Sequence, residues 1–250
     1  MSQVKKEKKT VLGWLKWAGN RYFIKAMSSM ALGLFSSLII GLILSQLSMI
    51  PFLSWLKPFA DIVAASSPVV GSAIGVAVAH GLGAKPLVVF TSAVTGALGY
   101  SLGGPVGAFL AAVVGAELGN LVAGKTPVDI VLVPICTIVA GGLVGTFVGP
   151  PISALMTGLG AFINNATTLA PVPMGIIVST VMGLCLTAPI SSAAIAISLG
   201  LDGLAAGAAA VGCSAQMIGF AVASYRENKI GGLVAQGIGT SMLQFGNICR

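Results

Sequence analysis

The sequence predicts an all-α polytopic membrane protein with about eight transmembrane helices, some of them broken or re-entrant. Only 8% of the 250 residues are charged and 56% are apolar, whereas a soluble domain carries about 25% charged residues. The formal charges between residues 26 and 224 are few: Lys57, Asp61, Lys85, Glu117, Lys125, Asp129 and Asp202. A surface so poor in charge fits lipid, and not water, as its solvent.

Helices are predicted over strands because the apolar runs are continuous, as in residues 30–44 and 176–186. A membrane barrel would alternate apolar and polar residues with period two. Backbone groups in lipid must bond internally, and a spanning helix needs about 20 apolar residues. Residues 26–250 are therefore expected to form one membrane-embedded domain.

Residues 1–25 form a basic segment, which carries much of the net charge of +7. A basic flank before a first span is typical of a cytoplasmic amino terminus under the positive-inside rule, so a nucleic-acid-binding tail is not favoured. Trp14, Trp17, Tyr22 and Phe23 predict an interfacial helix on the cytoplasmic leaflet before Ala26.

The predicted spans follow from the apolar runs and their interruptions: Ala26–Ile50, Ile62–His80, Pro86–Gly103, Val106–Ala123, Val128–Val148, Ile152–Ala170, Met174–Leu199 and Leu204–Ser224, with a further apolar segment from Gly231. This order places four of the five basic residues in the connections on the cytoplasmic side, as the rule requires. The sixth span is the weakest, because it carries Asn164, Asn165, Thr167 and Thr168, and a re-entrant segment is its alternative.

Glycine is frequent in the sequence, with 34 residues. Small residues four apart let helix backbones approach closely, and five such pairs occur: Gly71/Gly75, Gly99/Gly103, Gly115/Gly119, Gly141/Gly145 and Gly203/Gly207. Breaks at 103–105, 149–151, 171–173 and 188–192 should interrupt helices. At membrane depth such breaks are tolerated only inside protein or along a cavity, and in transporters they often build the substrate site.

Glu117 and His80 are the two ionisable candidates for a site. An intramembrane carboxylate is costly, so its default interpretation is functional. Glu117 could accept hydrogen bonds from substrate hydroxyls, carry a proton, or pair with a buried donor such as His80. His80 closes the second predicted span before a glycine-rich turn, and a structural role is its alternative. For Lys125 and Asp129, four residues apart, an interfacial ion pair is expected.

Neutral polar residues supply the other candidates for substrate binding. Thr187, Ser191 and Ser192 surround Pro189; their hydroxyls could bind a polyhydroxylated ligand or satisfy carbonyls freed by the proline. Later in the chain come Gln216 and a stripe of Gln236, Thr240 and Gln244, four residues apart and therefore on one helix face. Such a polar stripe on a membrane helix is expected to face the interior of a helix bundle or a water-filled pathway.

Catalytic, nucleotide-binding and metal-binding motifs are absent from the sequence. The four cysteines are scattered without a CxxC pair, so neither a metal site nor a disulfide framework is expected. No cofactor is expected either, and whether the chain takes part in an enzymatic reaction is left open.

Three late segments carry a family resemblance: Leu186–Ile195 around Pro189, Gly203–Met217, and Gly237–Gln244. With them, the chain resembles the IIC-like membrane subunits of the bacterial phosphotransferase system, more narrowly the branch that includes perfringolysin-regulator-type membrane proteins. The resemblance begins near Phe23.

The resemblance implies a permease subunit in the bacterial plasma membrane that binds a sugar at mid-membrane. A separate IIB component, which works with a IIA component, phosphorylates the sugar. It also implies a homodimer. Related subunits bind sugar with a glutamate and a histidine, but neither motif aligns here residue by residue. No phosphoacceptor residue of IIA or IIB type is found, so phosphotransfer would belong to the complex. The domain is expected to be shortened at its carboxyl end.

Three functions remain open at this point. The leading one is the sugar permease, with a polar cavity lined by Glu117, the Thr187–Ser192 break and the stripe from Gln236 to Gln244. The second is a membrane sensor or regulator that keeps the permease fold without transport, since fold does not fix function. The third is a channel or exporter for a small polar solute.

Overall fold

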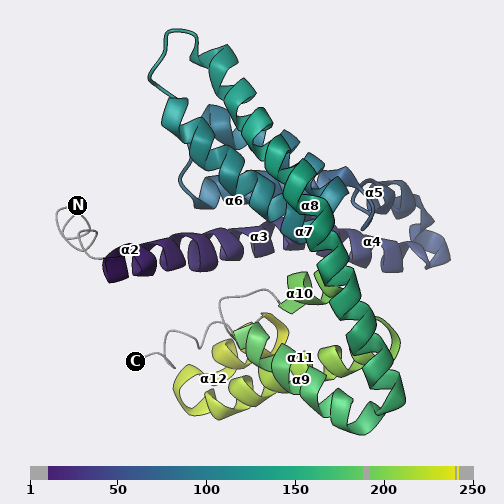
Figure 1. Cartoon of the computed structure of the whole chain (residues 1–250). Coiled ribbons are helices and arrows are strands. Elements are labelled where there is room, and N and C mark those ends of the chain that lie inside the picture. Colours follow the sequence, from purple (N-terminus) through teal and green to yellow (C-terminus); the bar gives the residue numbers. More distant parts are fainter. Residues whose placement is uncertain (1–10, 188–191, 240, 242–250) are drawn as a thin grey trace. The chain divides into compact units, whose positions relative to one another are not determined.

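The computed structural model describes residues 11–187, 192–239 and 241, and all elements within them are helical (Figure 1). The chain forms two compact units, one ending at Ser153 and the other beginning at Ala154. The prediction of an all-α protein is confirmed. Each unit is described by itself.

The first unit begins with a continuous helical stretch from Val11 to Ser48, within which Lys16–Ser48 is a long apolar run of 33 residues. It consists of α2 (Val11–Ala18), the π-helical η1 (Gly19–Ala26), α3 (Met27–Leu34), the π-helical η2 (Phe35–Ile39) and α4 (Ile40–Ser48). The backbone stays helical at Ala26, where a surface helix was predicted to turn into a span. The first apolar helix therefore begins earlier than the apolar run suggested.

A short connection leads through η3 (Pro51–Leu56) and α5 (Lys57–Ile62) to α6 (Pro68–Gly81). Two local signals start α6: Pro68 occupies the first turn, and the Ser67 hydroxyl accepts a hydrogen bond from the Val69 N–H at 3.3 Å. Serine before proline is a typical helix start. With 14 residues, α6 is shorter than the span predicted from residue 62.

The next helix, α7 (Pro86–Val122), is two helices joined at Gly103 and Gly104. Gly104 has φ +60°, a conformation that glycine adopts readily, and Pro105 follows it. The two halves fold back on each other, because a Cβ built on Gly99 would lie 2.5 Å from the carbonyl oxygen of Gly107. The predicted break between two spans is confirmed here.

The helices α6 and α7 pack through their glycines. A Cβ on Gly71 or Gly75 of α6 would overlap the backbone of α7, at the carbonyl oxygens of Gly96 and Ser92 respectively. Side chains are excluded from this crossing, so the two backbones touch almost directly, as small residues four apart predict.

The helix α8 (Asp129–Leu169) runs for 41 residues through Pro150 and Pro151. The break predicted at 149–151 does not end the helix, although the boundary between the units falls just after it. Asp129 accepts hydrogen bonds from the backbone N–H groups of Gly124 and Thr126, and among the described residues no ion pair joins it to Lys125.

The second unit continues with α9 (Pro171–Thr187), α10 (Ser192–Leu199), α11 (Gly203–Ala223), α12 (Tyr225–Val234) and the π-helical η4 (Ala235–Gly239). Val178, Met182 and Ala209 form its small buried core. The break predicted at 171–173 is confirmed, because α8 ends at Leu169. Asn164, one of the polar residues near the end of α8, bonds to the connection after α10. Its amide donates to the Gly200 carbonyl at 3.0 Å and accepts from the Asp202 N–H at 3.2 Å.

Within the part of the chain that the structure describes, four helical stretches are long and apolar enough to cross a membrane: Lys16–Ser48, Pro86–Val122, Asp129–Leu169 and Gly203–Ala223; α6 and α9 are shorter apolar helices. Many large apolar side chains on these helices are exposed, among them Phe90, Phe147 and Ile176. Apolar surface on this scale is typical of contact with lipid. The chain is an all-α membrane protein.

Candidate functional site

A chain of three polar side chains lies inside the second unit. The Gln216 amide Nε2 donates to Thr187 Oγ1 at 3.0 Å, and Thr187 Oγ1 is 3.0 Å from Ser241 Oγ. Thr187 and Ser241 are buried and Gln216 is half-buried. We call these three residues the polar cluster.

The packing of α9 against α11 builds this cluster. Gly183 and Gly212 meet where these helices cross: a Cβ on Gly183 would lie 2.9 Å from the Gly212 carbonyl oxygen. Thr187 follows Gly183 by four residues, and Gln216 follows Gly212 by four. Residues four apart share one helix face, so the close crossing brings Thr187 and Gln216 together one turn later.

Ser241 reaches the cluster from the segment after η4. Near the end of α11, Gln236 Nε2 donates to Ser224 Oγ at 2.9 Å, and Gly237 lies beside Ile218 and Ala221. The chain therefore runs back along α11 toward Gln216. Gln236 is buried, and its Oε1 has no hydrogen-bond partner among the described residues. A buried acceptor without a partner costs about 1–3 kcal/mol.

A second contact of the same unit involves Ser192, the buried first residue of α10. The Cys213 thiol lies 3.7 Å from Ser192 Oγ and 3.7 Å from the Met182 carbonyl oxygen. The thiol is a weak donor, so it ties α11 to the start of α10 and to α9. Ser192 belongs to the predicted break at 188–192, of which residues 188–191 lie outside the described residues.

The chemistry available in the cluster is neutral hydrogen bonding. A carboxamide offers two donors and one acceptor oxygen, and each hydroxyl offers one donor and two acceptor lone pairs. Among the described residues, no group of three His, Cys, Asp or Glu side chains gathers as a metal site would need. Amides and hydroxyls among apolar helices suit a neutral, hydroxylated ligand.

Glu117 lies in the first unit, on the second half of α7, and its partners are Arg21 and Tyr22. Arg21 Nε donates to Glu117 Oε1 at 2.7 Å, and the Tyr22 hydroxyl donates to the same oxygen at 3.1 Å. The Arg21 guanidinium also lies 5.5 Å from the centre of the Trp17 ring, a cation–π contact. Of the alternatives for Glu117, pairing is observed, with Arg21 in place of His80.

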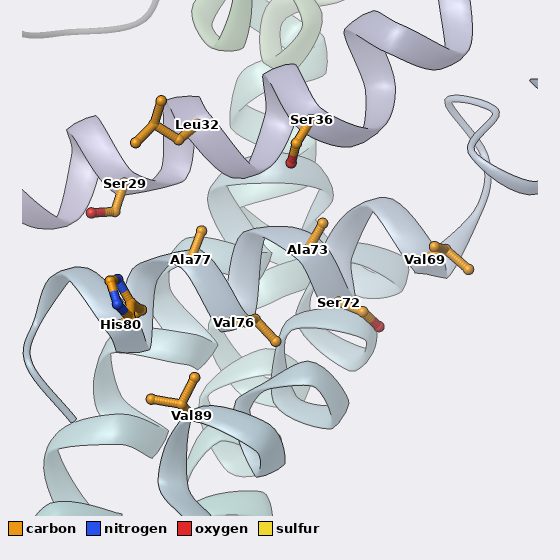
Figure 2. Close-up of a pocket in the computed structure, with 10 residues that line it drawn as sticks. All are labelled: Ser29, Leu32, Ser36, Val69, Ser72, Ala73, Val76, Ala77, His80 and Val89. Carbon is orange, nitrogen blue, oxygen red and sulfur yellow. The ribbon is translucent and has the colours of Figure 1, made fainter. Parts of the chain in front are cut away.

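His80 lies in the first unit at the end of α6, where it is exposed and lines a groove of about 640 Å³ between α3, α6 and α7 (Figure 2). Ser29 of α3 lies at the same end of the groove. Apart from His80 and three serines, all the residues that line it are apolar.

The predicted site residues thus divide between the units. Thr187 and Gln216 are brought into hydrogen-bonding contact, while Ser192 and Gln236 are buried elsewhere in the second unit. Ser191, Thr240 and Gln244 lie outside the described residues. Glu117 and His80 belong to the first unit.

Sequence reasoning missed three contact residues, Arg21, Tyr22 and Ser241. A signal existed for Arg21: the carboxylate of Glu117 lies in apolar sequence and needs a cation, and basic residues crowd the amino terminus. Ser241 adjoins the predicted stripe but lies one position off its spacing of four.

Comparison with known proteins gives one result. The family model described as "Phosphotransferase system, EIIC" matches residues 24–250. Searches of curated proteins and of solved structures find no significant match. Because the matched range covers most of the chain, this protein belongs to the phosphotransferase system EIIC family.

Proposed function

We propose that the protein is the membrane permease subunit of a sugar phosphotransferase system, and that the polar cluster of Thr187, Gln216 and Ser241 contributes to its sugar site. Membership of the EIIC family supports a permease-type function. The observation that carries the assignment to this cluster is the hydrogen-bonded pair of Gln216 and Thr187, where Thr187 directly precedes the interruption predicted at 188–192.

The chemistry of the cluster supports a sugar over a charged substrate. Sugar hydroxyls both donate and accept hydrogen bonds, as the amide of Gln216 and the hydroxyls of Thr187 and Ser241 do. Segments at membrane depth that interrupt apolar helices are where transporters often place substrate.

The orientation and partners form part of the proposal. The basic residues before Ala26 favour a cytoplasmic amino terminus in a bacterial plasma membrane. A separate IIB component would phosphorylate the sugar as it is released, since this sequence has no phosphoacceptor motif. A homodimer is the expected assembly.

A second function, a sensor without transport, is favoured by one observation. Gln216 and Ser241 each bond to Thr187, and polar networks of this kind also hold helices together. In a sensor, the cluster would fix the fold and sugar would not be translocated.

A binding and uptake experiment separates the two functions. Labelled sugars are screened for binding to the purified protein and for uptake by cells that also make IIA and IIB proteins. Gln216→Leu should weaken binding of the retained sugar at least about ten-fold, the effect of losing about 1.4 kcal/mol. The matched control is Gln46→Leu, at an exposed position on α4, and it should bind normally.

The possible outcomes distinguish the permease from the sensor. Phosphorylated sugar inside the cells supports the permease, and binding without uptake supports the sensor. If Gln216→Leu binds sugar as tightly as the unaltered protein, the cluster is not the sugar site.

A further inference from the structure

The groove beside α3 and α6 has the shape and polarity of an acyl-chain site. Its walls include Leu32 of α3, Val69, Ala73 and Ala77 of α6, and Val89 of α7 (Figure 2). Small alanines on α6 leave the space open. A groove with such walls gives water few partners, whereas a hydrocarbon chain loses nothing by entering it.

The length of the groove matches an extended chain. From Val69 to His80, α6 rises by eleven residues, or about 16 Å. The helices α3 and α6 run in opposite directions, because Gly33 approaches Ala73 and Gly81 approaches Ser29. The amino end of α3 therefore meets the carboxyl end of α6.

The basic side chain that lines the groove lies at that one end, whereas two of the three lining serines, Ser36 and Ser72, lie toward the other end. His80 and Ser29 both line the groove at that end (Figure 2). Ser29 Oγ donates to the Lys25 carbonyl at 3.0 Å, so Lys25 lies one helical turn beyond the groove, and its side chain is exposed. At the other end, the Ser36 hydroxyl donates to its own helix at the Gly33 carbonyl.

We propose that this groove binds an anionic phospholipid, with an acyl chain along Ala73 and Ala77 and the phosphate beside Lys25 and His80. Charge complementarity selects the headgroup: a basic side chain near a membrane surface attracts anionic lipid with about 1 kcal/mol, or about five-fold in affinity. The apolar walls select a lipid over a free anion. The groove is separate from the polar cluster, so a test of the lipid site does not depend on the proposed sugar site.

The test measures lipid retained by the full-length protein after delipidation in detergent. Phosphatidylglycerol and phosphatidylcholine with identical oleoyl chains are titrated in turn, and bound lipid is counted by native mass spectrometry. We expect phosphatidylglycerol to bind about five-fold more tightly. Lys25→Gln should remove that preference, while Lys57→Gln, at another exposed lysine, should keep it.

A second pair of variants tests the groove itself. Ala77→Phe fills the groove and should abolish retention of both lipids, while Ala93→Phe, a half-buried alanine of α7 that does not line it, should retain them. If Ala77→Phe does not fold, the milder Ala73→Val should reduce retention of both lipids. Equal binding of the two lipids, or full retention by the filled variant, would overturn the proposal. A dimer mass without lipid that Ala77→Phe abolishes would assign the groove to a second copy.

Discussion

The two units of the molecule bury polar side chains in different ways. In the first unit, the hydroxyls of Ser37, Ser92 and Thr137 each donate to a carbonyl one turn earlier in their own helix. In the second, Thr167 does the same, whereas Thr187 bonds to side chains from two other segments. A bond within one helix is formed wherever the helix lies. A bond between helices requires a fixed arrangement, so the contacts of Thr187 carry positional information that a binding site needs.

The packing of the units differs as well. In the most apolar stretch of α7, 44% of the residues are buried, against 17% in α11. Glycine crossings explain the first value, because Gly71, Gly75 and Gly96 bring α6 and α7 into backbone contact. The first unit is therefore expected to depend on close packing, and the second on a few polar contacts.

The largest expected effect comes from filling the crossing of α6 and α7. Gly75→Leu places a side chain where the backbone of α7 lies and should destabilise the protein by about 3 kcal/mol or more. Gly207→Leu is the matched change in α11, where a Cβ meets nothing within 4 Å, and it should be nearly neutral. Unfolding in detergent micelles measures both variants; equal losses would contradict the comparison.

The next effect tests the polar cluster. Thr187→Val leaves Gln216 and Ser241 without their shared partner and should cost about 1–2 kcal/mol. Thr137→Val removes a hydroxyl that bonds only within its own helix, so a few tenths of a kcal/mol are expected. The same unfolding assay compares the two. A larger loss for Thr137→Val would show that burial and not the contact between segments sets the cost.

The ion pair of Arg21 and Glu117 is expected to contribute less. Both side chains are a quarter to a third exposed, so the coupling energy from a double-mutant cycle of Arg21→Gln and Glu117→Gln should be about 0.5–1 kcal/mol. Uptake provides a second readout. Loss of uptake in Glu117→Gln alone would indicate a ligand role, and equal behaviour of the two variants would indicate that the pair only holds η1 against α7.

The smallest effects concern two asparagines that fasten turns. Asn120 accepts one bond, from the Lys85 N–H at 3.0 Å, and Asn120→Ala should cost about 0.5 kcal/mol. Asn164 makes two bonds, to Gly200 and Asp202, so Asn164→Ala should cost about twice as much. The reverse order would show that the number of bonds does not set the stability of these turns.

The sequence alone determined that the chain is helical and embedded in a membrane, because scarcity of charge and long apolar runs leave no other way to satisfy the backbone. It also determined the break at Gly103–Pro105, where glycine and proline act locally. At Pro150–Pro151 the same local signal did not end α8, so local preference was overridden there.

The tertiary structure decided which polar groups meet. The pairing of Thr187 with Gln216 depends on the crossing at Gly183 and Gly212, and the pairing of Arg21 with Glu117 joins residues 96 positions apart. Sequence spacing fixes only which residues share a helix face. The partner across a crossing is set by how two helices pack, and that depends on contacts far apart in the chain.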